Sequence, residues 1–143
     1  MNKEWEIKFL AVLGRESEQE EKEFLKLLDQ AKDNLNLEVM RVLMRSFTNK
    51  PDYGTQERVI NVMSNGEDEL VIQAILEELP RLVVEAPEWA EALIGPEVDN
   101  RPTVLSKVAL KMPIEIRRAL MELLKSKDFQ DFYPSANKVT LSL

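Results

Sequence analysis

The feature that most constrains the fold is the spacing of apolar residues at three and four positions, within segments of roughly 10–17 residues. This spacing places the apolar side chains on one face of an α-helix, whereas a half-buried strand would show alternation. The pattern predicts helices over residues 17–33, 37–47, 56–64, 67–79, 88–94, 101–111 and 114–126, with a short turn over 128–133. Residues 137–143 are expected to form an extended strand or an irregular cover over the core.

Polar residues and glycine predict several helix ends in the first half. Ser17 followed by Glu20 is a capping-box pattern, in which each side chain satisfies a free backbone N–H of the first helical turn. Thr55 is expected to cap the helix that begins at residue 56. Gly14 follows an apolar run and is expected to form a left-handed C-terminal cap.

Prolines are expected to divide the second half into short helices. Pro80 is predicted to end one helix and begin the next, because proline suits the first helical turn. Pro87 is predicted to begin a short helix in the same way, and Gly95-Pro96 to end it.

Short connections between these segments predict an all-α fold of antiparallel helix pairs. Leu79-Pro80 and Met112-Pro113 are similar junctions 33 positions apart, which is near the period of two-helix repeats. We therefore expect a single helical domain over residues 1–143, either a short α-solenoid-like (HEAT-like) stack or an irregular helical bundle.

Two residue types that serve most catalytic sites do not occur in this sequence. Without cysteine or histidine, a thiolate or imidazole nucleophile, a catalytic triad, a zinc finger and a haem ligand are excluded. Four scattered glycines cannot form a phosphate-binding loop. The abundant carboxylates lie at surface-patterned positions, so we expect no enzymatic activity, no cofactor and no metal. A hydrolase with a metal bound by carboxylates is the enzymatic alternative.

Hydropathy predicts a cytoplasmic protein with no membrane association. The first residues lack the basic start and apolar run of a signal peptide. No apolar run approaches the roughly 20 residues of a membrane span.

The negative charge is concentrated in the middle of the chain. Residues 52–99 carry twelve acidic and two basic side chains, a charge of −10. Residues 1–51 carry ten acids and nine bases (−1), and residues 101–143 carry four acids and eight bases (+4), which together give −7. Such a field favours a basic protein partner and disfavours direct binding of nucleic acid. The alternative is that these acids only begin helices and solvate their surfaces.

Two adjacent segments carry a family resemblance. Leu76-Glu77-Glu78-Leu79-Pro80, followed by Ala86-Pro87-Glu88-Trp89-Ala90-Glu91-Ala92-Leu93, resembles the all-helical bacterial immunity proteins called immunity family thirty. Residues 52–63 resemble the acidic-aromatic helix start that precedes this core in the family, and residues 113–124 are similar to its closing helix. The resemblance covers roughly residues 50–125, and the loop expected at residues 95–102 departs from it.

The resemblance implies a toxin as the partner. Such immunity proteins neutralise the C-terminal domains of polymorphic or contact-dependent growth-inhibition toxins in the bacterial cytoplasm, and many of these domains are nucleases, including RNase and EndoU-like domains. An acidic face would occupy the basic substrate groove or bind beside it. Tyr53 would supply apolar contact area, while Trp89 is expected to anchor the core. The candidate toxin contacts are Asp52, Tyr53, Glu57, Glu67, Asp68, Glu85, Glu88 and Glu91.

The alternative function is a helical-repeat scaffold that binds a peptide or helix in an apolar groove. Met40 and Met44, one helical turn apart, would line such a groove, or they simply fill the core. The oligomeric state stays open at this point.

Overall fold

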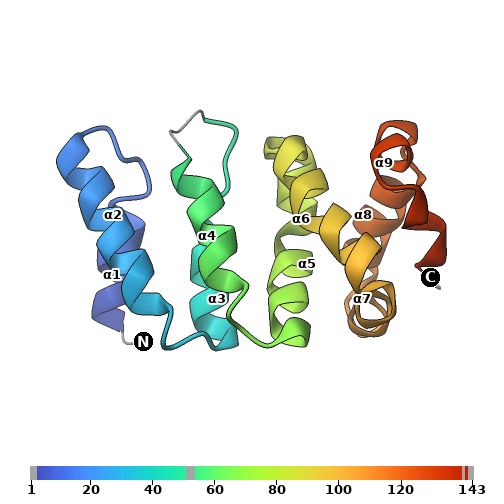
Figure 1. Cartoon of the computed structure of the whole chain (residues 1–143), viewed down its shortest axis with the longest axis horizontal. Coiled ribbons are helices and arrows are strands. Elements are labelled where there is room, and N and C mark those ends of the chain that lie inside the picture. The colour runs from blue at the N-terminus through green and yellow to red at the C-terminus, as the bar shows by residue number, and fades with distance from the viewer. Residues whose placement is uncertain (1–2, 51–53, 140, 142–143) are drawn as a thin grey trace. The chain divides into compact units, whose positions relative to one another are not determined.

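The computed structural model describes residues 3–50, 54–139 and 141, and within these ranges the chain is all-helical, without a β-strand (Figure 1). This confirms the predicted fold class. The elements are α1 Lys3–Ala11, α2 Glu18–Ala31, α3 Leu37–Met44, α4 Thr55–Met63, α5 Asp68–Glu85, α6 Pro87–Asn100, α7 Pro102–Ala109, α8 Ile114–Lys125, α9 Lys127–Phe132 and the 3₁₀-helix η1 Pro134–Lys138.

The chain groups into two compact units. Unit 1 comprises residues 1–46 and 50–71, and unit 2 comprises residues 47–49 and 72–143. Each unit has its own buried apolar side chains. The single domain expected from the sequence stays a prediction.

Three aromatic side chains form a cluster in the core of unit 1. The rings of Trp5 and Phe9 stack with centroids 5.2 Å apart, and Phe9 lies 5.1 Å from Phe24. The indole N–H of Trp5 donates to the carbonyl of Leu27 at 2.9 Å, so its polar atom is satisfied in the core. The guanidinium of Arg15 covers the ring of Phe24 at 4.0 Å, which adds a cation–π contact at the edge of this core.

Half of the capping box predicted at the beginning of α2 forms: Ser17 caps the helix, but the Glu20 carboxylate accepts from the Ser17 hydroxyl instead of from the Ser17 backbone N–H. Ser17 is its N-cap, and the Ser17 hydroxyl oxygen accepts the backbone N–H of Glu20 at 3.1 Å. The same hydroxyl donates to the Glu20 carboxylate at 3.2 Å. The cap satisfies an N–H group that the helix itself leaves without a partner.

Two other predicted caps of unit 1 are wrong. Thr55 is the first residue of α4 and is buried, whereas Gly54 occupies the N-cap position with φ of 87°. Glycine adopts this left-handed conformation without Cβ strain. Gly14 is not left-handed; the positive φ of 36° belongs to Arg15. Helix α1 ends at Ala11, too early for Gly14 to serve as its cap.

Helix α3 ends at Met44, three residues before the predicted end. Asn36 begins it by accepting the N–H of Val39 at 2.9 Å. Met40 and Met44 are completely buried, so both fill the core. The methionine-lined groove of the scaffold alternative is therefore wrong.

Pro80 lies inside α5, so the prediction that it ends this helix is wrong. A proline in a helix interior costs about 3 kcal/mol, because the carbonyl four residues earlier loses its N–H donor. Leu79 and Leu82 beside it are fully buried. Burial of each leucine stabilises the fold by about 1.5–3 kcal/mol, which offsets the proline.

Helix α6 begins at Pro87 as predicted, but it continues through Gly95 and Pro96 to Asn100, so the predicted break is wrong. Gly95 is buried against the ring of Tyr133, where a Cβ atom would overlap the ring. The glycine permits close packing here and does not end the helix. The ring of Tyr133 also lies 5.0 Å from that of Phe129, which is fully buried.

The remaining helices of unit 2 begin close to the predicted positions. Pro113 is the N-cap of α8, and the Ser126 hydroxyl caps α9. Because Pro80 lies within a helix and Pro113 precedes one, the two proline junctions are not equivalent, and the 33-residue repeat is not supported. In the described part of the tail, η1 extends to Lys138 and no strand forms, whereas residues 140, 142 and 143 of the predicted strand lie outside the described residues.

Candidate protein-binding surface

Three of the predicted contact residues lie together where α5 ends and α6 begins, and we call this place the α5–α6 elbow. Glu85 is the last residue of α5 and its side chain is 61% exposed. Glu88 lies in the first turn of α6 and is exposed, while Glu91 follows one turn later and is half-buried. Val84, beside them in sequence, is 80% exposed, so the elbow presents an apolar side chain among carboxylates.

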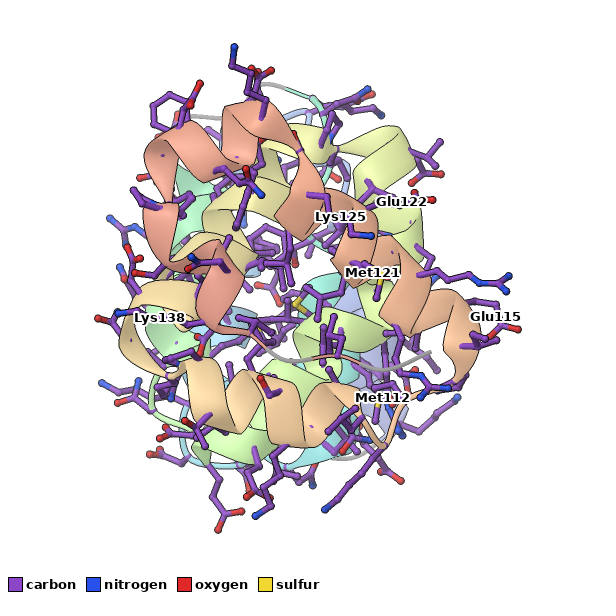
Figure 2. The ribbon with its side chains drawn as sticks, turned by 90° about the vertical axis from the view of Figure 1, so that its right-hand side faces the viewer. Met112, Glu115, Met121, Glu122, Lys125 and Lys138 are labelled. Carbon is purple, nitrogen blue, oxygen red and sulfur yellow. The ribbon has the colours of Figure 1, made fainter. Side chains whose placement is uncertain are left out.

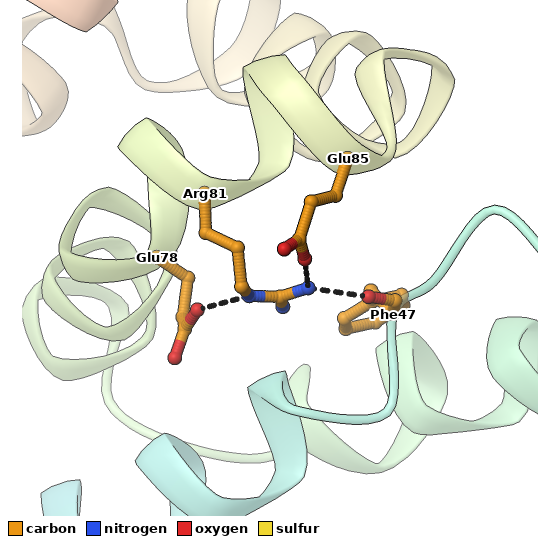
Figure 3. Close-up of polar contacts among 4 residues, drawn as sticks. All are labelled: Phe47, Glu78, Arg81 and Glu85. Carbon is orange, nitrogen blue, oxygen red and sulfur yellow. Dashed lines mark hydrogen bonds and ion pairs between the residues drawn. The ribbon is translucent and has the colours of Figure 1, made fainter. Parts of the chain in front are cut away.

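Arg81 forms the polar centre of the elbow (Figure 3). Its Nε donates to Glu78 at 2.7 Å, and its Nη1 lies 3.3 Å from Glu85. The same Nη1 donates to the backbone carbonyl of Phe47 at 3.0 Å, which ties residue 47 to α5. Glu85 therefore already has a basic partner within the chain, so part of the charge that the sequence count assigns to the elbow is neutralised.

An aromatic contact supports the elbow beneath its charged surface. The rings of Phe47 and Trp89 lie 5.0 Å apart with an interplanar angle of 55°. Phe47 is fully buried and Trp89 half-buried, in keeping with the anchoring role expected for Trp89. Arg81 and Trp89 thus hold Phe47 through its carbonyl and its ring.

Glu88 and Glu91 differ from Glu85, because neither has a partner within the described ranges. Neither carboxylate makes an ion pair or hydrogen bond to any residue that the structure describes. Glu88 lies near the positive end of the α6 dipole, which stabilises its charge. Glu91 lies beyond the first turn, where the helix dipole stabilises a negative charge much less.

The other predicted contacts belong to unit 1 or lie outside the described residues. Glu57, Glu67 and Asp68 belong to unit 1 and are exposed. Asp52 and Tyr53 lie outside the described residues.

The sequence analysis did not predict two residues of the elbow, Arg81 and Val84. Arg81 is one of two basic residues in the acidic segment, and it lies three positions after Glu78 and four before Glu85. Ion pairs within a helix form at these spacings, so the ion pairs of Arg81 could have been predicted from the sequence. Val84 follows Leu82-Val83 in an apolar run that gave no sign of which member is exposed.

The described residues form neither a metal site of acidic side chains nor a membrane-spanning helix. Among the described residues, no group of three or more acidic side chains is arranged to hold a metal ion. Within the same ranges, none of the helices combines the length and hydropathy needed to span a bilayer.

A separate groove of about 240 Å³ lies between α1 and α2. Its lining combines acidic, basic and apolar side chains, namely Glu4, Trp5, Lys8, Glu23, Lys26, Leu27 and Gln30. Glu4 and Lys8 form an ion pair of 3.1 Å at this groove. Because acids and bases balance there, the groove selects a basic partner less strongly than the elbow does.

Comparison with known proteins gives no relative: no protein-family model, no curated protein and no solved structure matches the chain. The resemblance of residues 50–125 to immunity proteins therefore stays a prediction.

Proposed function

We propose that the protein is an immunity protein that binds and neutralises a cognate bacterial toxin domain, a nuclease with a basic substrate groove. The observation that carries the proposal is the pair of carboxylates on α6, Glu88 and Glu91, which have no partner within the described part of the chain. Lysine and arginine side chains of a nuclease groove are their chemical complement.

The elbow also has the composition of a protein interface. Val84 supplies exposed apolar area, and the exposed carboxylates of Glu85 and Glu88 lie near it in sequence. Interfaces commonly combine an apolar centre with a polar rim. Glu85 exchanges its contact with Arg81 for an intermolecular one at little cost, because exposed ion pairs contribute only about 0–1 kcal/mol.

Anchoring of the elbow favours tight binding. Arg81 bonds to the carbonyl of Phe47, and Trp89 packs on its ring, so the elbow is ordered before a partner arrives. A preorganised surface loses less conformational entropy on association.

The deciding experiment is co-purification with the C-terminal domain of the toxin encoded beside this protein. We expect a stable complex, loss of the domain's nuclease activity, and an association rate that falls steeply as salt rises. A domain that neither binds nor loses activity when this chain is in excess would refute the proposal.

Matched variants test the elbow itself. Glu88→Lys/Glu91→Lys should reduce the association rate at least tenfold at low salt, because two attractive charges become repulsive. Glu16→Lys/Asp33→Lys changes the net charge by the same amount at two exposed positions of unit 1. This pair should reduce the association rate much less. Equal effects of the two pairs would contradict an elbow interface, and thermal unfolding would show that each variant is folded.

A further inference from the structure

Helix α8 presents four charged side chains that the proposed toxin interface does not use, and we call them the α8 stripe: Glu115, Arg118, Glu122 and Lys125. All four are exposed, and the three- and four-residue spacing places them on one face of the helix. Leu120 and Leu124 are buried on the opposite face. Figure 2 shows Glu115, Glu122 and Lys125 along the outer side of α8, together with Met121.

The stripe has no partner among the residues that the structure describes. None of its four side chains forms an ion pair or hydrogen bond with another residue in the ranges that the structure describes. Other exposed acids and bases do pair along their own helix, such as Glu4 with Lys8 and Glu18 with Lys22. The stripe has the spacing for such pairs and does not form them.

The order of charges makes the stripe complementary to itself. Its signs alternate along the helix: negative, positive, negative, positive. Positions 115 and 125 have the same midpoint as positions 118 and 122, namely residue 120. If two copies of α8 lie antiparallel about a two-fold axis at that level, Glu115 of each copy faces Lys125 of the other, and Arg118 faces Glu122. A parallel arrangement in register would instead place every charge against its like.

Met121 adds an apolar contact at the same place. It is half-buried and lies one position from the midpoint, so the methionines of two antiparallel copies would meet beside the axis. Met112 lies on the same side of the molecule in Figure 2 and is also half-buried. Methionine adapts to contacts of this kind because its side chain is flexible and polarisable.

We propose that this face of α8 docks onto α8 of a second copy of the chain, antiparallel, to form a two-fold symmetric dimer. Such an interface uses the same patch on both subunits, which requires the self-complementary order of charges described above. One helix pair buries less than the roughly 1,200 Å² of a standard stable interface, so we expect a micromolar or weaker dissociation constant. The proposal does not depend on the toxin-binding function.

A charge-exchange experiment tests the pairing directly. Arg118→Glu/Lys125→Glu makes the stripe wholly negative, and Glu115→Lys/Glu122→Lys makes it wholly positive. By sedimentation velocity at low salt, the native chain should dimerise with rising concentration, and each variant alone should associate at least tenfold more weakly. An equimolar mixture of the two variants should form a heterodimer at least as readily as the native chain dimerises.

Two further measurements separate specific docking from general charge effects. Lys127→Glu changes an exposed charge outside the stripe and should leave dimerisation within about twofold of native, because single exposed charges contribute little. The natural sequence contains no cysteine, so Met121→Cys allows coupling by a short thiol cross-linker across the axis, whereas Asp33→Cys in unit 1 should not couple. A native chain that stays monomeric at several hundred micromolar, variants that fail to form the heterodimer, or equal cross-linking at both positions would each overturn the proposal.

Discussion

Gly95→Ala tests the packing of unit 2, because two physical effects predict opposite signs. Alanine is about 1 kcal/mol more favourable than glycine within a helix, and Gly95 lies inside α6. However, the added methyl group would overlap the ring of Tyr133, which packs on the buried Phe129. Displacing a packed side chain costs about 1–3 kcal/mol, and the aromatic contact adds about 0.5–1.5 kcal/mol. We therefore expect a net destabilisation of about 1–2 kcal/mol.

Thermal and urea unfolding, followed by circular dichroism, measure this effect. The melting temperature should fall by about 3–8 °C, given the usual unfolding entropy of a chain of this size. In a Tyr133→Ala background the clash is absent, so the same substitution should stabilise by about 1 kcal/mol. The two backgrounds should thus differ by about 2–3 kcal/mol.

A matched control and a clear refutation complete the experiment. Gly14→Ala adds a methyl group where no atom lies within 4 Å, so its effect should stay within about 1 kcal/mol. The prediction is refuted if Gly95→Ala stabilises the native chain. It is also refuted if the substitution changes the free energy of unfolding by the same amount in both backgrounds, because the contact with Tyr133 would then contribute nothing.

Substitutions at three further residues test polar contacts, each by urea unfolding. Arg81→Met should cost about 1–3 kcal/mol, because it leaves the carbonyl of the buried Phe47 without its donor; a loss below about 0.5 kcal/mol would show that water replaces the donor. Ser17→Ala should cost about 1 kcal/mol through loss of the α2 N-cap, and Ser17→Gly only a few tenths, so an equal cost for both would contradict the cap. Glu97→Gln should cost about 1–3 kcal/mol, because the buried carboxylate accepts two bonds from Arg101, at 2.6 and 2.8 Å; an unchanged stability would contradict that pairing.

Local chemistry predicted the fold class and several helix starts. Ser17 caps α2 and Pro87 begins α6 because the relevant interactions lie within one helical turn. The same local rules failed at Pro80, where burial of the neighbouring leucines offsets the proline, and at Gly95, where a distant residue decides the outcome. The ring of Tyr133, 38 positions from Gly95 (133 − 95), explains why a glycine is suited to the middle of a helix.

The candidate surface shows a similar division. Counting charges located the acidic segment, but charge alone did not distinguish Glu85, which pairs with Arg81, from Glu88 and Glu91, which have no partner in the described ranges. Nor did it separate the acids of unit 1 from those of unit 2. Whether a carboxylate is buried or paired depends on where its side chain points, and a count of charges along the sequence does not show this.

The two tryptophans of the chain fall into different units, with Trp5 in unit 1 and Trp89 in unit 2. Each has a distinct quenching environment, since Trp5 stacks on Phe9 with its N–H bonded, whereas Trp89 lies half-buried against Phe47. Intrinsic fluorescence of Trp5→Phe and Trp89→Phe therefore provides one optical probe for each unit without added labels. Coincident unfolding curves would identify a single cooperative domain over residues 1–143, and separate curves would identify two independently melting parts.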